Sequence, residues 1–377
     1  MMAVGSGPDW LLWAVRRIAG LAAQLALLVS CPVIAGVSVQ HRVRGRLAEG
    51  TPAAVVTLQF RPGPPTWRPL RARQVRWEGG QNGYRGRRDG SNSMSEAVKA
   101  FTVGTVECRV LSDGIMAYEP ESLYTGLPPE QTAPVVSPLL DDRGLVRVPY
   151  HPLLVRTGAG LALIDTGAGL GLAEQSGEPV GRLPEALAAA GVAADDVALV
   201  VLSHAHPDHI GGLTAGNGSG RRLAFPRARH VIGRAEYEYW TAGPVPGDFA
   251  WMGELARQHL IPVGQAGLLD LVEGEQEVAP GIRVIPAPGH TPGHMAISLT
   301  SGSQQAVFLA DAVLGEPNFA HPDWTSALET DRTQAARTRR QLLDAAARDT
   351  AIVAGYHLWQ PGMVERHADA YRWNPLR

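Results

Sequence analysis

Three histidines and one aspartate fall within six consecutive positions in the run SHAHPDHIGG, residues 203–212, directly after the apolar stretch 197–202. Imidazole nitrogens and carboxylate oxygens are the ligands that zinc and similar divalent metals prefer. Because residues two apart in extended backbone point the same way, His204 and His206 can contact one ion. Asp208 and His209 follow the turn and can face a second ion. A chance match is rare, so the run predicts a metal site.

Four ligands cannot hold two ions and leave a position open for chemistry, so further ligands must come from elsewhere in the chain. Four other segments bring an acid or histidine to a turn beside an apolar run: LIDTG (163–167), PGHTPGH (288–294), VFLAD (307–311) and AIVAGYH (351–357). Together with the histidine run, these segments resemble the signature motifs of the metallo-β-lactamase superfamily. They occur in that family's order between residues 101 and 377.

The resemblance implies seven ligands, three for each of two ions and one shared. The first ion would be held by His204, His206 and His294, and the second by Asp208, His209 and His357, with Asp311 spanning both. Asp165 would orient the histidine run without binding metal. His290 lies in the same Pro/Gly turn as His294 and is expected to be a structural turn residue.

Two metal ions roughly 3.5–4 Å apart can share a water and lower its pKa toward neutrality, which gives a hydroxide nucleophile. We therefore expect a dinuclear metal-dependent hydrolase, in which Asp208, Asp311 and Asp165 serve the reaction. Two Zn²⁺ are the default cofactors, and Mn²⁺ or Fe²⁺ also suits these ligands. Cys108 lies in an alternating stretch and is expected to be a small buried residue rather than a nucleophile. The alternative is an iron-loaded redox or oxygen-chemistry member of the same fold.

The expected substrate is a small neutral molecule with an ester-like bond: a lactone, a carboxylic ester or a phosphotriester. Residues 94–377 carry a net charge of −11, which argues against a nucleic-acid partner. The segment 319–324 and the helical pattern after it resemble the branch of methyl parathion hydrolase and quorum-quenching lactonases. In acyl-homoserine lactonases of that branch a tyrosine lies three residues beyond the bridging aspartate, where this chain has Leu314.

The walls of a substrate pocket are expected to come from loops. The segment 115–149 is long and Pro-rich, and it either folds over the metals as an apolar lid or packs at an edge. Its candidate wall residues are Tyr118, Leu123, Tyr124 and Leu127, and later in the chain Phe249, Trp251 and Trp324.

The first 93 residues differ from the rest, because they hold 13 Arg, no Lys and four acidic residues, a net charge of +9. Residues 10–39 are apolar, and residues 40–93 are rich in Arg, Gly and Pro, a composition that does not pack a core. We expect Met94 to be the natural start, with a cytoplasmic hydrolase domain over 94–377. The alternative is a signal or anchor segment at 10–39, and hence an exported or membrane-anchored protein. A homodimer is left open.

Hydrophobic periodicity predicts an α/β fold in which two mixed sheets pack face to face with helices outside, an αββα sandwich, as the resemblance also implies. Period-two runs predict six strands: Leu161–Asp165, Ala198–Leu202, Arg229–Ile232, Ile282–Ala287, Met295–Thr300 and Ala306–Leu309. The last two strands flank a hairpin turn at 301–303. Helical periodicity predicts helices over Leu183–Ala190, Arg234–Trp240, Gly253–His259 and Thr333–Ala347. The metal ligands would then follow strand ends along one edge of the sandwich.

Overall fold

The computed structural model describes residues 99–216, 220–245 and 247–376, and all of them belong to one compact unit. The segments predicted as a leader (1–93), with the apolar run 10–39 and Met94, lie outside the described residues. Among the helices that are described, none has the length and apolar character needed to cross a membrane.

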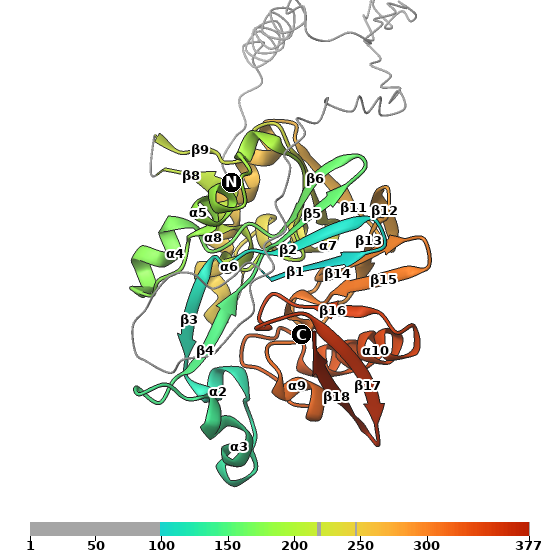
Figure 1. Ribbon diagram of the computed structural model, residues 1–377. Coiled ribbons are helices and arrows are strands. Elements are labelled where there is room, and N and C mark those ends of the chain that lie inside the picture. The colour runs from blue at the N-terminus through green and yellow to red at the C-terminus, as the bar shows by residue number, and fades with distance from the viewer. Residues whose placement is uncertain (1–98, 217–219, 246, 377) are drawn as a thin grey trace, which may run out of the picture. The chain divides into compact units, whose positions relative to one another are not determined.

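The first sheet has seven strands, in the order β1-β2-β5-β6-β7-β10-β11 (Figure 1). Their bounds are β1 Lys99–Val103, β2 Val106–Val110, β5 Leu153–Thr157, β6 Gly160–Ile164, β7 Val197–Val201, β10 Arg229–Gly233 and β11 Leu269–Val272. The first four strands pair antiparallel, and β6, β7, β10 and β11 run parallel. The parallel strands end at one edge of the sheet, where β7 leads into the histidine run.

The second sheet also has seven strands, in sequence order from β12 to β18. Their bounds are β12 Gln276–Ala279, β13 Ile282–Pro286, β14 Met295–Ser301, β15 Gln304–Phe308, β16 Ile352–Ala354, β17 Gly362–His367 and β18 Ala370–Pro375. All neighbours are antiparallel except β15 and β16. The predicted hairpin is confirmed, since Ser301 pairs with Gln304 and Gly302 takes a φ of 62° in the turn.

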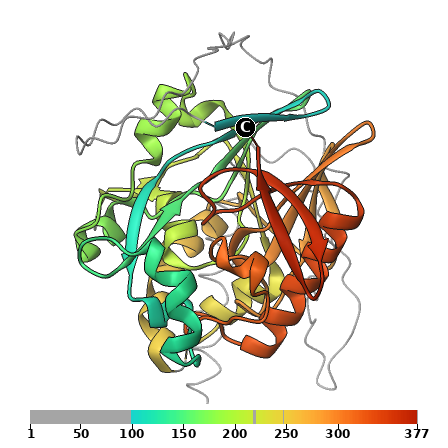
Figure 2. The same ribbon diagram turned by 60° about the horizontal axis from the view of Figure 1, so that its bottom comes forward.

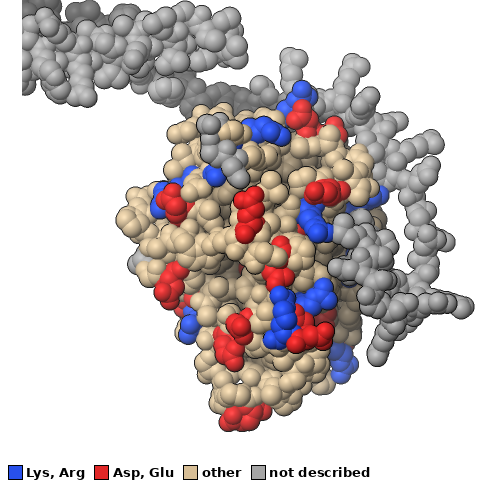
Figure 3. All heavy atoms as spheres, turned by 90° about the vertical axis from the view of Figure 1, so that its left-hand side faces the viewer, with Lys and Arg blue, Asp and Glu red and all other residues tan. Residues whose placement is uncertain are grey.

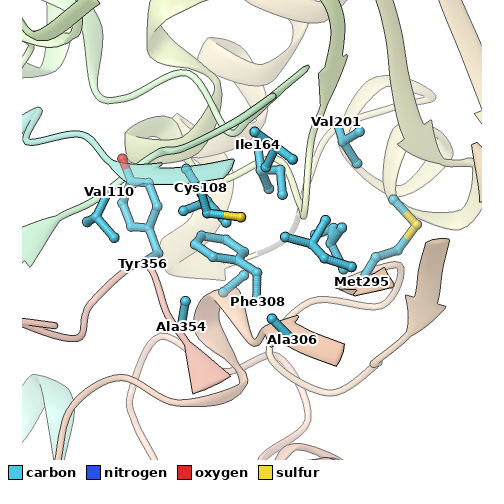
Figure 4. Close-up of a cluster of buried hydrophobic side chains, with 14 of the residues drawn as sticks. Cys108, Val110, Ile164, Val201, Met295, Ala306, Phe308, Ala354 and Tyr356 are labelled. Carbon is cyan, nitrogen blue, oxygen red and sulfur yellow. The ribbon is translucent and has the colours of Figure 1, made fainter. Parts of the chain in front are cut away.

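The two sheets pack face to face because each strand alternates its apolar side chains between two layers. Val155, Ile164 and Val201 of the first sheet share one buried cluster with Phe308 and Ala354 of the second (Figure 4). Cys108 is fully buried in the same cluster, and burial raises the pKa of its thiol to about 12, so the expectation of a small buried residue is confirmed.

Helices cover the outer faces of both sheets (Figures 1 and 2). On the first sheet, Leu163 and Val200 pack in one cluster with residues of the helices α5, α7 and α8. On the second, Val307 and Val353 pack with Leu343 and its neighbours on α10. The bounds are α5 Leu183–Ala189, α7 Arg234–Thr241, α8 Ala250–Gln265 and α10 Arg332–Arg348. The αββα sandwich is therefore confirmed, with all six predicted strands and all four predicted helices.

Shorter helices lie in the connections: α2 Pro120–Leu123, α3 Pro129–Val136, α4 Gly169–Ser176, α6 Pro207–Ile210 and α9 Pro317–Ala320. The prediction of α8 ended too early, because the helix continues past His259 and through Pro262. The segment 115–149 is not a plain loop. It contains α2 and α3 between the paired strands β3 (Gly114–Tyr118) and β4 (Val146–Tyr150). A second small ribbon joins β8 (Thr214–Ala215) and β9 (Arg222–Leu223).

Candidate metal centre

The histidine run leaves β7 and turns at once into the short helix α6. His206 is the residue before that helix, and it keeps extended backbone angles (φ −67°, ψ 149°). Pro207 follows at the first helical position, where its fixed φ and missing N–H fit the start of a helix. This local geometry directs His204 and His206 to one side and delivers Asp208 and His209 one turn further on. All four side chains are buried.

The remaining predicted ligands come from the second sheet. His294 immediately precedes β14, Asp311 lies in a 3₁₀ turn after β15, and His357 follows β16. Because β14 runs antiparallel to β15 and β15 runs parallel to β16, these three positions lie at one edge of the sheet. The backbone N–H of Met295 donates to the carbonyl of Ser203 at 2.9 Å, which joins this edge to the histidine run.

Two groups of candidate ligand atoms result. In each group, every ligand atom lies within 4.8 Å of the others. The first group is His204, His206, His290 and Asp311, and the second is Asp208, His209 and His357. The structure thus brings six of the seven predicted ligands into the two groups, and it places His290 in the first group where His294 was predicted.

Asp311 lies between the imidazoles of both groups. Its Oδ1 is 3.1 Å from Nε2 of His209, and its Oδ2 is 3.2 Å from Nε2 of His357 and 3.7 Å from Nε2 of His204. The side chain is only 3% exposed. Oδ2 thus lies near imidazoles of both groups and Oδ1 near one of the second group, so this carboxylate can reach both candidate sites.

His290 and His294 both contact this centre, but in different ways. Nε2 of His290 lies 3.1 Å from Oδ2 of Asp311 and 3.0 Å from Nδ1 of His206. Nδ1 of His294 donates to the carbonyl of Ala287 at 3.1 Å, and its Nε2 accepts the backbone N–H of Asp311 at 3.1 Å. The expectation that His290 serves only the turn was incomplete, because the turn carries both rings to Asp311. The sequence offered no signal for this.

Histidine ligands usually donate their second ring N–H to a protein oxygen, which leaves the other nitrogen free for the metal. Four predicted ligands have a partner of this kind at Nδ1. They are His204 with Ser203 Oγ, His209 with Asp165, His294 with Ala287 O and His357 with Pro149 O. His290 has no partner at Nδ1. At Nδ1, His294 thus matches the other predicted ligands and His290 does not, whereas Nε2 of His294 accepts the backbone N–H of Asp311.

Asp165 lies directly behind the histidine run and is fully buried. Its carboxylate accepts the N–H of Ser203 at 2.7 Å, the hydroxyl of Ser203 at 2.8 Å and Nδ1–H of His209 at 2.8 Å. The Ser203 oxygen is in turn 3.0 Å from Nδ1 of His204. Asp165 has a positive φ of 61°, which is unusual for a residue other than glycine and is held here by these bonds. Its position agrees with the predicted orienting role.

The electrostatics of the centre suit a cation. Burial, together with the neighbouring His209, holds the pKa of His204 well below its ordinary value, and burial beside His290 lowers the pKa of His294 to about 3. Burial alone would raise the pKa of Asp311, but the imidazoles of His209 and His357 bring it well below its ordinary value. Burial alone would lower the pKa of His209. The nearby carboxylates, of which Asp311 has the largest effect, instead raise it well above its ordinary value. The pocket therefore favours a positive charge next to its carboxylates.

Whether these residues fit bound metal can be tested on their hydrogen bonds. Nε2 of His204, His206 and His209 and Oδ1 of Asp311 are buried atoms with no hydrogen-bond partner. Buried polar atoms almost always have a partner, so four unpaired atoms within the two candidate ligand groups are unusual. Metal ions would satisfy all of them, and neutral imidazoles with ionised carboxylates are the states that metal binding requires. The residues fit the implied ions.

A pocket of about 160 Å³, open to solvent, lies above this centre. Its floor consists of four predicted ligands: His206, Asp208, Asp311 and His357. Its wall is apolar and consists of Met116, Leu123, Val148, Leu172, Trp251, Met252, Leu314 and Leu328. Two tyrosines, Tyr118 and Tyr150, also line the pocket, and their hydroxyls are 2.5 Å apart.

The predicted wall residues are only partly confirmed. Tyr118, Leu123 and Trp251 line the pocket, and the segment 115–149 supplies one side of it, as a lid would. Tyr124 and Trp324 instead pack against each other, with ring centroids 5.6 Å apart, and Leu127 and Phe249 are not among the lining residues. The sequence missed Tyr150, Leu172, Met252 and Leu328, which come from separate segments without a shared motif.

Comparison with known proteins agrees with this geometry. The sequence profile of the metallo-beta-lactamase superfamily matches residues 147–357, more than half of the chain. The chain therefore belongs to the metallo-β-lactamase superfamily. It is 30% identical to an N-acyl homoserine lactonase of Bacillus thuringiensis over 139 residues, which are 37% of this chain and 47% of that protein. The chain thus matches about half the length of its curated relatives.

Solved structures show the same architecture over a longer stretch. AidC, a dizinc quorum-quenching lactonase in complex with the product N-hexanoyl-L-homoserine, has a TM-score of 0.68 at 26% identity, over 74% of this chain and 97% of AidC. The hydrolase AbOPH has a TM-score of 0.69 at 24% identity, over 76% of this chain and 99% of AbOPH, a likeness of fold alone.

Proposed function

We propose that the protein is a dinuclear metal-dependent hydrolase that cleaves a small, neutral, ester-like substrate, with a lactone as the first candidate. The proposal rests on the composition of the pocket. Its floor joins both groups of metal-binding side chains, and its wall is apolar. The lactonase activity of the relatives supports the choice of a lactone.

Two ions would be held by these residues, the first by His204, His206 and His294 and the second by Asp208, His209 and His357, with Asp311 shared. Such a pair supplies a hydroxide nucleophile at neutral pH and polarises the substrate's carbonyl or phosphoryl oxygen. Zinc is the proposed metal, since these nitrogen and oxygen ligands suit it and one structural neighbour is a dizinc enzyme.

The charges around the pocket favour a neutral substrate. No Lys or Arg from the described part of the chain lines the pocket, and the acids Asp208 and Asp311 lie in its floor. On the molecular face drawn in Figure 3, basic and acidic side chains are interspersed, without a broad basic patch. A polyanion such as a nucleic acid requires clustered basic residues. Neither the lining of the pocket nor the face in Figure 3 provides such a cluster.

The tyrosine pair supplies the wall's hydrogen-bonding group. Two hydroxyls that face each other use one proton for their mutual bond and leave the second proton available. Tyr150 is fully buried, whereas Tyr118 is only partly buried, so Tyr118 is placed to donate its proton into the pocket. Burial raises the pKa of both phenols, which keeps them protonated. The pair thus offers a donor to a substrate oxygen where Leu314 has none.

A substrate panel tests the proposal. The purified full chain would be assayed against an acyl-homoserine lactone, a simple aliphatic lactone, an open-chain aryl ester and a phosphotriester at equal concentrations. We expect turnover of at least one neutral ester, with the acyl lactone cleaved most efficiently, and loss of all turnover after chelation. Failure to cleave any of the four by a chain shown to contain two ions would refute the proposal.

A further inference from the structure

One buried carboxylate outside the predicted ligand set contacts both histidine-bearing turns. Glu236 lies in the first turn of α7 and is fully buried. It accepts four hydrogen bonds, two at each oxygen, and none of them involves a cation. A buried charge without a basic partner is costly to keep, so its partners must be placed with care.

Two of the four bonds hold the histidine run. Oε1 accepts the backbone N–H of Ala205 at 2.8 Å, and Ala205 lies between His204 and His206 in the sequence. The same oxygen accepts the indole N–H of Trp240 at 2.7 Å, one helical turn further along α7. The Trp240 ring packs edge-on against His206, with centroids 5.3 Å apart. Glu236 therefore holds the backbone at Ala205, directly before His206, and the indole that packs against the His206 ring.

The other two bonds hold the turn at 288–294. Oε2 accepts the hydroxyl of Thr291 at 2.7 Å and the backbone N–H of Gly293 at 2.9 Å. The approach is so close that a Cβ on Gly293 would lie 2.1 Å from the backbone nitrogen of Glu236. A glycine is thus required directly before His294, and α7 is packed hard against this turn.

We propose that Glu236 is the positioning residue of the first metal site. It binds the two turns that carry His206 and His294 to the two oxygens of one carboxylate, and so sets how well these histidines meet the same ion. This inference rests on the proposed metal centre. It gives Glu236 a role distinct from that of Asp165, whose bonds to His209 and, through Ser203, to His204 reach both sites.

The substitution Glu236→Gln separates these contacts. The N–H groups of Ala205 and Trp240 can only donate, so the amide oxygen must stay on their side. The amide NH₂ then faces Thr291, whose hydroxyl can turn and accept, and Gly293, whose N–H is left without an acceptor. The variant keeps the histidine run in place and releases the turn before His294. Thr291→Val is the milder second variant, because it removes only one bond to the same oxygen.

The test uses the metal-free full chain and Co²⁺, whose visible absorption reports its ligands. Wild type should take up two ions. In Glu236→Gln the affinity for one ion should fall by about 10–100-fold, the usual cost of losing a group that orients a ligand. The remaining spectrum should match that of His294→Ala, in which only the second site is intact. Thr291→Val should lower the affinity for the same ion by a smaller factor. Asp165→Asn should lower the affinity for both ions.

Asp113→Asn is the matched control. Asp113 is also fully buried and accepts backbone N–H groups, from Ala168, Gly181 and Leu183, but it makes no bond to either histidine turn. It should lower the denaturation midpoint and keep both ions. If the Glu236 and Thr291 variants bind both ions as wild type does, or lose both in equal proportion, the inference about Glu236 is overturned. The proposed function is then unaffected. A wild-type chain that binds no Co²⁺ would overturn the proposed function as well.

Discussion

The floor of the pocket is made of polar side chains fixed by hydrogen bonds, whereas its wall is made of apolar side chains from segments far apart in the sequence. In the floor, His357 is oriented by the carbonyl of Pro149, and the hydroxyl of Tyr356 donates to the carbonyl of Asp208 at 2.6 Å. In the wall, Trp251 is 42% exposed and is not fixed by any such bond in the described structure. The floor is built for one chemistry, and the wall can change without disturbing it.

This difference leads to two kinds of substitution. A change in the floor should abolish turnover of every substrate, because all of them need the same ions. A change in the wall should alter the ranking of substrates and leave the metal content intact.

Asp311→Asn should have the largest effect. The neutral amide lacks the negative charge with which a carboxylate can bridge two cations. We therefore expect kcat/KM to fall by about 10³-fold or more on every substrate, equivalent to about 4 kcal/mol. Metal analysis of the same preparation should show fewer than two ions per chain. His367→Ala, at an exposed histidine in β17, is the control and should retain full activity. Full activity in the Asp311 variant would remove this carboxylate from the mechanism.

Separate substitutions of the two turn histidines should sharpen the description of the floor. His294→Ala should lose one ion and most activity, since Nδ1 of this ring is held by the carbonyl of Ala287 and its Nε2 lies 3.1 Å from the backbone nitrogen of Asp311. His290→Ala should keep two ions and show a smaller loss. Metal content and kcat measured on both variants decide the matter. The reverse order of effects would make His290 the ligand.

Tyr118→Phe tests the hydrogen-bonding part of the wall. Loss of one substrate hydrogen bond should lower kcat/KM about tenfold, with the metal content unchanged. Tyr124→Phe removes the hydroxyl of a buried tyrosine that does not line the pocket, and it should have little effect on kcat/KM. Equal kinetics for the two variants would mean that Tyr118 does not contact the substrate.

Trp251→Ala should have the smallest effect, confined to substrates with long acyl chains. A methylene buried against the wall contributes about 0.8 kcal/mol, roughly fourfold in kcat/KM, so wild type should improve as the chain grows. The variant should show a shallower dependence on chain length. Leu170→Ala provides the control, because Leu170 is also an exposed apolar residue (58%) but does not line the pocket. Parallel chain-length curves would place the acyl chain elsewhere.

The same contrast explains what the sequence could predict. Candidate ligands such as Asp208 and His357 could be predicted because metal binding restricts the residue types and each follows a strand that the hydrophobic pattern marks. The wall could not, since Leu172 and Leu328 are ordinary apolar residues whose meeting depends on the packed fold. Glu236 was also missed, because one acid in a charged helical segment looks like a solvated side chain. The choice between His290 and His294 depended on ring orientation, which no spacing reveals.

We propose that one pocket holds two ions between these seven side chains. Titration of the metal-free full chain with Zn²⁺, with hydrolysis of an acyl lactone followed at each step, tests it most directly. We predict that two equivalents bind, that activity reaches its plateau only with the second equivalent, and that Asp311→Asn neither binds two nor gains activity. Saturation at a single equivalent with full activity would contradict the account.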